Sequence, residues 1–160
     1  MPTDPSEVVV REALPGEWMA IADLYSEARR AAVPQMPPAI HTDEEHRGYY
    51  RRHVLEGDGH TVWVAESHGE IVGFAVCTPA FLDGLYVRPE VKGHGIGSLL
   101  LDVVDATHVD GYELWVFTSN EGARRLYERR GLVEVERTDG AGNEERSPDI
   151  RMAWRPPGRG

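Results

Sequence analysis

Two segments of the chain place apolar residues three and four positions apart, which is the spacing of one face of a helix. The first segment carries this pattern at Trp18, Ile21, Tyr25, Ala28 and Ala32. The second carries it at Ile96, Leu99, Leu100, Val103, Val104 and Thr107. We therefore predict helices over residues 17–33 and 95–108.

Two further helices are indicated by residues that start or stop helices. Thr42 with Glu45 three positions later is the pattern of a capping box, in which each side chain accepts a hydrogen bond from the backbone N–H of the other residue. It predicts a helix within residues 41–56. Asn120 is a favoured residue before a helix and Gly131 after one, so a fourth helix is predicted between them.

Short runs rich in β-branched and aromatic residues flank and separate these helices. They lie at residues 8–14, 60–66, 70–77, 81–87, 112–120, 132–140 and 149–155. The element order β-α-α-β-β-β-α-β-α-β-β predicts an α/β fold with a mixed, mostly antiparallel central sheet of about seven strands, flanked by about four helices. We expect one domain over residues 1–156 and a frayed tail at 157–160.

The composition narrows the class of protein. A chain of 160 residues fits one domain, and a net charge of −10 argues against a nucleic-acid binder, which would carry a basic face. The single cysteine, Cys77, excludes an intrachain disulfide framework and a thiolate-rich zinc site, and we expect no metal. No apolar run approaches the ~20 residues that span a membrane, and the start of the chain lacks a signal-peptide pattern. We therefore expect a cytoplasmic protein that does not bind a membrane.

Three glycines at alternate positions, Gly93, Gly95 and Gly97, stand at the start of the predicted 95–108 helix. Glycine weakens a helix, so its use here indicates that a ligand approaches the backbone closely. The N-terminus of a helix favours anions, and Lys92 adds a positive charge. The segment therefore predicts a cradle for a pyrophosphate group.

Other interpretations of these glycines fit less well. A phosphate-binding Walker loop needs Lys followed by Ser or Thr after its glycines, and neither pair is present. A dinucleotide fingerprint needs Gly or Ala where Ser98 stands, and it follows its strand directly, whereas "RPEVK" intervenes here. A tight turn without a ligand remains as the other alternative.

The segment "VKGHGIGSLLL" resembles the acetyl-CoA-binding motif of the GCN5-related N-acetyltransferase (GNAT) superfamily. Lys92, Gly95 and Gly97 occupy the three fixed positions of that motif, with Lys in place of the usual Arg or Gln. "SNEGARRLYERRGL", residues 119–132, resembles the second signature of the superfamily, and the order of elements matches over essentially the whole chain. The end of the chain, "RTDGAGNEERSPDIRMAW", is similar to a bacterial branch whose members often lack a known substrate.

The resemblance implies the GNAT fold and acetyl-CoA as the acyl donor. Backbone groups of Leu85, Tyr86 and Val87 would pair with the pantetheine arm. The pyrophosphate would be held beside Lys92 by the backbone amides of the glycine turn: Gly93, His94, Gly95, Ile96, Gly97 and Ser98. Asn120 would contact the arm, and it shares a helix face with Ala123, Arg124 and Tyr127. Asn120 would also serve as a plain helix cap, and the two roles can coexist.

The implied reaction is direct attack of a primary amine on the thioester. An alkyl ammonium has a pKa of about 10, so it must lose a proton before it can attack. Strand alternation places Asp83 on the face of Leu85 and Val87, where it is a candidate base; the alternative is a hydrated aspartate at the start of a strand. Tyr127 is the candidate donor to the departing sulfur, and a core aromatic is its alternative.

The acceptor pocket of this fold is expected at the start of the second helix, so His41, Glu44 and Asp83 are candidate substrate-binding residues. Glu45 is expected to act as the capping-box partner instead. Glu144 and Asp149 in the last loop would add negative charge around a cationic acceptor, or would simply be solvated.

We therefore expect an acetyl-CoA-dependent N-acetyltransferase acting on the primary amine of a small molecule. The alternative is a non-catalytic acetyl-CoA-binding module of the same fold that senses or docks. The acceptor, the acyl-chain length and a homodimer stay open.

Overall fold

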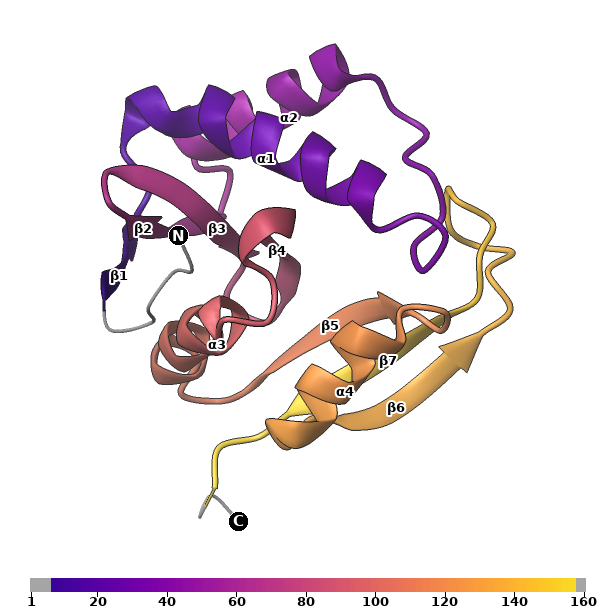
Figure 1. Ribbon diagram of the computed structural model, residues 1–160. Helices are drawn as coiled ribbons and strands as arrows, with labels where there is room; N and C mark the ends of the chain where they lie inside the picture. The colour runs from indigo at the N-terminus through magenta and orange to yellow at the C-terminus, as the bar shows by residue number, and fades with distance from the viewer. Residues whose placement is uncertain (1–6, 158–160) are drawn as a thin grey trace.

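The computed structural model describes residues 7–157. This part of the chain forms four α-helices and seven strands (Figure 1). The strands are β1 (Val8–Glu12), β2 (Thr61–Ser67), β3 (Glu70–Cys77), β4 (Leu82–Val87), β5 (Tyr112–Phe117), β6 (Val133–Thr138) and β7 (Asp149–Trp154). The helices are α1 (Trp18–Ala31), α2 (Asp43–Leu55), α3 (Ile96–Thr107) and α4 (Glu121–Arg129), with short 3-10 turns η2 (Pro15–Glu17) and η3 (Pro89–Val91). The predicted frayed tail at 157–160 lies outside the described residues except for Pro157.

The predicted α/β fold and its element order are confirmed, but the strands form two sheets. The first sheet has the order β1-β2-β3-β4 and the second the order β5-β7-β6, and all these neighbours are antiparallel. A single parallel bridge between Phe81 and Glu113 joins them. The two sheets part beyond this bridge because β4 and β5 do not pair along their length.

Helices cover both faces of the first sheet and one face of the second (Figure 1). On one face of the first sheet, α1 and α2 pack over a core that includes Ile21, Val64 and Phe74. On the other face, α3 contributes Leu100 and Val104 to a second core. This second core continues into the β5-β7-β6 sheet under α4, through residues such as Tyr112, Leu114, Ile150 and Met152.

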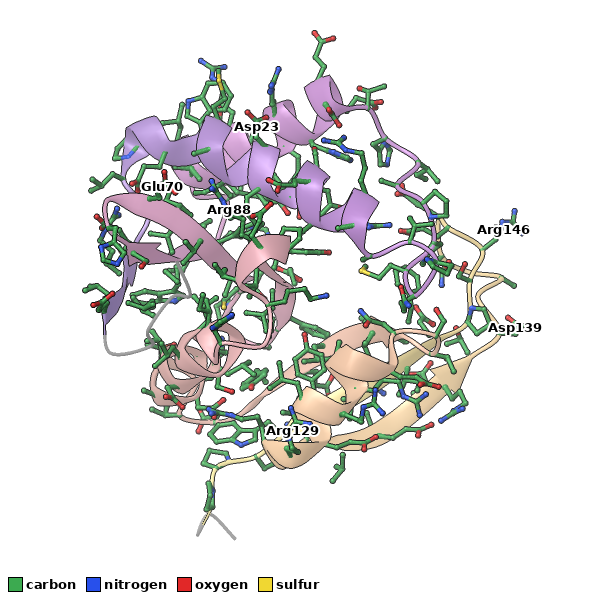
Figure 2. All side chains as sticks on the ribbon, viewed as in Figure 1. Asp23, Glu70, Arg88, Arg129, Asp139 and Arg146 are labelled. Atoms are coloured by element: carbon green, nitrogen blue, oxygen red, sulfur yellow. The ribbon has the colours of Figure 1, made fainter. Side chains whose placement is uncertain are left out.

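The segment between α1 and α2 lies beside the C-terminal half of the molecule (Figure 1). Ser119 Oγ donates a hydrogen bond to the carbonyl oxygen of Gln35 at 2.5 Å. Arg29, which is 5% exposed, donates to the carbonyl oxygen of Pro37 and to the Tyr25 hydroxyl, each at 2.9 Å. The same segment meets the β6–β7 loop, which Figure 2 marks with Asp139 and Arg146. The contact with Ser119 and the contact with the β6–β7 loop bring together loops that are distant in the sequence.

Within residues 7–157, no helix combines the length and the apolar character that crossing a membrane requires.

Candidate functional site

Strand β4 has one paired edge and one open edge. The paired edge forms a ladder with β3 from Leu82 to Val87. On the other side the chain meets β5 only near the bridge at Phe81, where Glu113 N–H donates to the Ala80 carbonyl at 2.9 Å. Beyond it, no described strand pairs with the second edge of residues 85–87. Backbone groups there can pair with an extended ligand that carries amides.

The glycine-rich turn ends in a helix start that can bind an anion. Gly93 and Gly95 have φ angles of +84° and +81°, in the left-handed region that favours glycine. Gly95 is the residue before α3 and has no side chain, so no capping side chain accepts a hydrogen bond from the first amides of this helix. Such amides, with the helix dipole behind them, favour a phosphate group.

The third glycine of the turn serves packing. A Cβ atom on Gly97 would lie 3.3 Å from Cδ2 of Leu126 and 4.0 Å from Cδ2 of Leu85. The idea that all three glycines clear space for phosphate oxygens is therefore wrong for Gly97, whose missing Cβ lets α3 approach α4. Ile96 is 1% exposed, so only its backbone amide is available to a ligand. Lys92 is exposed, while His94 and Ser98 are half-buried.

Asn120 caps α4 as the sequence predicted. Its side-chain oxygen accepts a hydrogen bond from Ala123 N–H at 3.4 Å. Arg124 turns back onto the preceding loop and donates to the Thr118 carbonyl at 2.9 Å. The cofactor contacts predicted for Asn120, Ala123 and Arg124 stay predictions.

A cavity of about 550 Å³ opens on the face of β4 that is turned toward α1 and α2. Its walls come from α1, α2, β3, β4 and the β6–β7 loop. Four tyrosines line it: Tyr25, Tyr49, Tyr50 and Tyr86. Three carboxylates line it as well: Glu45, Asp83 and Glu144. Such a wall of aromatic rings and carboxylates suits a ligand with an apolar body and a positive charge.

Asp83 lines this cavity, and the alternation that placed it with Leu85 and Val87 is wrong. Leu82, Leu85 and Val87 all pack on the α3 side of the sheet. Residues 82 and 85 are three positions apart and would point to opposite faces of a regular strand, so the alternation of side chains is interrupted between them. The ladder shows why: Cys77 pairs with Leu82 and Val76 with Gly84, which leaves Asp83 as an extra residue in a β-bulge. Burial raises the pKa of the Asp83 carboxyl, and the neighbouring His60 opposes that rise.

His41 and Glu144 meet at the rim of the cavity. His41 Nε2 lies 3.0 Å from Glu144 Oε2, and His41 Nδ1 lies 3.3 Å from Glu45 Oε2. The two carboxylates raise the pKa of His41. Glu45 also forms the predicted capping box with Thr42. The structure thus brings together His41, Asp83 and Glu144 at one cavity, and their role in binding an acceptor stays a prediction.

Two acidic residues from the acceptor prediction lie elsewhere. Glu44 is exposed on α2 and is not among the residues that line the cavity, because it points from a different side of the helix than Glu45. Asp149 accepts hydrogen bonds from Thr138 Oγ1 and, at 3.2 Å, from Asn143 Nδ2. Asp149 therefore holds the β6–β7 loop in place. The structure therefore does not bring Glu44 into this cavity with His41 and Asp83.

Tyr127 is 8% exposed and belongs to the core beneath α4, so the core role foreseen for its ring is present. Burial raises the pKa of its hydroxyl, which therefore stays protonated at neutral pH. The Tyr127 hydroxyl also contributes to raising the pKa of Tyr86 on β4 and of Tyr112 on β5. It lies close to the two strands that part beyond the bridge.

Several residues of the cavity were not predicted from the sequence. His46 lines it, with Nδ1 2.9 Å from Ser26 Oγ, and burial lowers its pKa. Tyr86 was expected to act through its backbone, yet its ring lines the cavity and meets Tyr25 edge to face at 4.8 Å. The spacing of His46, Tyr49 and Tyr50 along one helix could have located this wall.

Within residues 7–157, no three His, Cys, Asp or Glu side chains come together as a metal site would need.

The sequence profile of the acetyltransferase (GNAT) family matches residues 18–132. An uncharacterized N-acetyltransferase of Archaeoglobus fulgidus is 33% identical over 110 residues, which cover 59% of this chain and 74% of that protein. Two further curated relatives are matched over 46% and 48% of their lengths, so the match spans about half of each.

Solved structures share the fold at low sequence identity. A GCN5-related N-acetyltransferase of Rhodopseudomonas palustris is 19% identical with a TM-score of 0.76, covering 98% of this chain and 99% of that one. The yncA protein of Salmonella typhimurium, solved with its cofactor acetyl-CoA, is 19% identical with a TM-score of 0.72, covering 93% and 94%. At these identities the likeness concerns the arrangement of the elements.

Proposed function

This chain belongs to the acetyltransferase (GNAT) family, and on that premise we propose that it transfers the acetyl group of acetyl-CoA to a primary amine of a small, cationic molecule. The observation that carries the proposal is the position of β4. One edge of this strand is open to an extended ligand, and one face of the same strand lines the cavity. An acyl donor along the edge and an amine in the cavity would meet at β4.

The donor side fits acetyl-CoA in two places. The open edge at residues 85–87 can pair with the amides of a pantetheine arm, and the uncapped start of α3 at Gly95 can hold a pyrophosphate. Lys92, His94 and Ser98 flank that turn, and Asn120, Ala123 and Arg124 begin the helix beyond it. When bound there, acetyl-CoA supplies an activated acetyl thioester. The relative solved with acetyl-CoA supports this assignment.

The acceptor side fits a cation. Glu45, Asp83 and Glu144 would attract an ammonium group into the cavity, while the tyrosine rings would pack on its apolar body. The ammonium must lose a proton to become a nucleophile. Asp83 faces the cavity from β4 and is the carboxylate that would accept this proton.

Tyr127 would help the sulfur to leave. Because burial keeps its hydroxyl protonated, the phenol is a hydrogen-bond donor at neutral pH. A donor aimed at developing negative charge on sulfur would stabilise the transition state. The position of Tyr127 near Tyr86 of β4 supports this role.

Direct attack by the amine, without an acetylated cysteine intermediate, agrees with the burial of Cys77. Cys77 is 2% exposed, and burial raises the pKa of its thiol to about 12. A thiol in this state is a poor nucleophile, because the thiolate is the reactive form. The chain therefore offers no cysteine suited to carry the acetyl group between donor and acceptor.

The test is release of the CoA thiol in the presence of polyamines, aminoglycosides and amino acids as separate acceptors. We expect release with at least one cationic amine and only background release without an amine. Tight binding of acetyl-CoA in calorimetry without release for any amine would contradict the proposal and favour a non-catalytic acetyl-CoA-binding module.

A further inference from the structure

His60 lies directly behind Asp83. Its Nε2 atom is 3.2 Å from Asp83 Oδ2, and the two side chains are 19% and 33% exposed. The other ring nitrogen, Nδ1, is 3.1 Å from the backbone carbonyl oxygen of Asp58. Asp83 lines the cavity and His60 does not, so His60 contacts the cavity only through Asp83. The pair leads from the cavity to the surface.

Both ring nitrogens of His60 face oxygen atoms that accept hydrogen bonds. A carbonyl oxygen can only accept, and so can an ionised carboxylate. A neutral imidazole has one N–H and can satisfy only one of these oxygens, whereas an imidazolium satisfies both. The geometry therefore suits an Asp83 carboxylate beside a His60 imidazolium. This is the state that results when an ionised Asp83 and a neutral His60 together gain one proton and the proton settles on His60.

An unusual turn holds His60 in this position. Gly57, Asp58 and Gly59 have φ angles of +78°, +45° and +76°, so three consecutive residues adopt the left-handed conformation. This conformation is uncommon for a residue with a side chain such as Asp58. His60 N–H donates to the Gly57 carbonyl at 2.6 Å and closes the turn.

A second histidine supports the ring of His60. His53 on α2 stacks on His60 with the ring centroids 3.9 Å apart and an angle of 33° between the planes. Both nitrogens of His53 are buried and have no hydrogen-bond partner. Burial lowers its pKa to about 4, so His53 is neutral at physiological pH. It provides a flat surface that orients His60 and does not itself exchange protons near neutral pH.

The other titratable groups around the pair are unsuited to take a proton from Asp83. Tyr49 on α2 and Cys77 on β3 have pKa values raised by burial and by Asp83, so both already hold their protons. Arg52 on α2 also lines the cavity, and its guanidinium donates hydrogen bonds but cannot accept one. Asp58 faces His60 through its backbone carbonyl. Among the described neighbours of Asp83, this leaves His60, whose Nε2 atom lies 3.2 Å from the Asp83 carboxylate and is the ring nitrogen that can accept a proton.

We propose that Asp83 and His60 form a two-residue relay that carries the proton of the acceptor's ammonium group out of the cavity. The proposal rests on the proposed acetyl transfer. Asp83 starts ionised and His60 neutral, with its proton on Nδ1. A carboxylate oxygen of Asp83 takes a proton from the ammonium, which breaks that N–H bond and leaves the nitrogen its electron pair. The proton passes to Nε2 of His60, and the imidazolium then releases one proton to solvent.

The relay is tested with His60→Gln, which keeps a hydrogen-bonding side chain of similar reach but cannot carry a proton at neutral pH. The probe is spermidine, or whichever amine of the panel the wild type acetylates fastest. We expect kcat at pH 7 to fall by roughly tenfold to a hundredfold, while the affinity for acetyl-CoA is unchanged. Added imidazole should partly restore His60→Ala and should not restore Asp83→Asn. The matched control is His68→Gln at the β2–β3 turn, whose side chain is 71% exposed and bonds to Glu7.

Full kcat in His60→Gln, or an equal loss in His68→Gln, would overturn the relay and leave the acetyl transfer standing. A wild type that releases no thiol with any amine would overturn the acetyl transfer itself and the relay with it.

A second measurement needs no amine. Carbon-13 NMR of the Asp83 carboxyl should show a higher pKa in His60→Gln than in the wild type, because the neighbouring histidine favours the ionised carboxylate. An identical Asp83 titration in the two proteins would overturn the coupling on which the relay depends.

Discussion

The Nε2 atom of His41 lies 3.0 Å from Oε2 of Glu144, a residue 103 positions further along the chain. This contact joins the segment before α2 to the β6–β7 loop and closes the rim of the cavity. It places a carboxylate from the last loop near the acceptor proposed for α2 and β4. The N-terminal and C-terminal halves of the chain therefore line the cavity jointly.

Glu144→Gln should weaken binding of a cationic amine. The amide keeps the shape of the side chain and removes its charge, so we expect KM for the amine to rise by roughly two- to fivefold, which is the usual size of one exposed charge interaction. The value of kcat should stay the same. Glu44→Gln is the control, because Glu44 carries the same charge close by on α2 and does not line the cavity. Steady-state kinetics measure both KM values. Equal KM values for the amine in the two variants would show that Glu144 does not contribute to binding it.

Substitution of Gly95 should impair acetyl-CoA binding. Its φ of +81° disfavours a β-branched side chain, and a Cβ atom would crowd a phosphate group at the start of α3. Gly95→Val should therefore lower both thermal stability and affinity. Gly95→Asn tolerates the left-handed backbone and separates the two effects.

In calorimetric titrations we expect the affinity of Gly95→Asn for acetyl-CoA to fall at least about tenfold, or about 1.4 kcal/mol. Gly16→Ala, at a position where an added Cβ meets nothing within 4 Å, is the control and should bind as the wild type does. A folded Gly95→Asn with unchanged affinity would count against the phosphate cradle.

Asp83→Asn should change the dependence of the rate on pH. In the wild type, Asp83 must be ionised to accept a proton, and burial raises its pKa, so the rate should rise with pH until the carboxyl is fully ionised. In Asp83→Asn turnover should be low at neutral pH. It should partly recover at high pH, where more of the amine is already deprotonated.

The control for this profile is Asp23→Asn. Asp23 is labelled in Figure 2 on α1, where it accepts a hydrogen bond from Arg47 at 2.9 Å. If Asp83→Asn, like Asp23→Asn, shows the same dependence of rate on pH as the wild type, then Asp83 is not the base.

Tyr127→Phe should reduce turnover with little effect on folding. The ring keeps its packing in the core, so the melting temperature and the affinity for acetyl-CoA should change little. The loss of one donor to the developing charge on sulfur should lower kcat by roughly tenfold to a thousandfold. The measurement is kcat from steady-state kinetics together with the melting temperature of the same variant. A variant that melts early and keeps full turnover per folded molecule would show that the tyrosine only packs the core.

The elements of this fold could be predicted because their signals are local. Thr42 and Glu45 form the capping box that their spacing indicated, and Asn120 caps α4. The glycine turn was recognisable because Gly93 and Gly95 adopt a conformation that other residues disfavour. Each of these inferences depends on residues within a few positions of one another.

The cavity proposed as the acceptor site was harder to predict because its walls depend on strand register and on contacts between distant residues. The bulge at Asp83 shifts this side chain from one face of β4 to the other. A glycine inside a strand can signal a bulge, and Gly84 is the local hint that could have located it. The proximity of His60 to Asp83 follows from that bulge together with the turn at residues 57–59, and the pairing of His41 with Glu144 has no local signal at all.

The most direct test of the central claim is the fate of the acetyl group itself. Wild-type protein is incubated with acetyl-CoA whose acetyl group is isotopically labelled, first alone and then with the amine panel. Mass spectrometry then measures the masses of the protein and of the small molecules. We predict that the protein mass stays unchanged at every time point and that the label appears on the nitrogen of a cationic amine, with one CoA thiol released for each acetyl group transferred. Label on the protein, or label that stays on CoA with every amine, would contradict it.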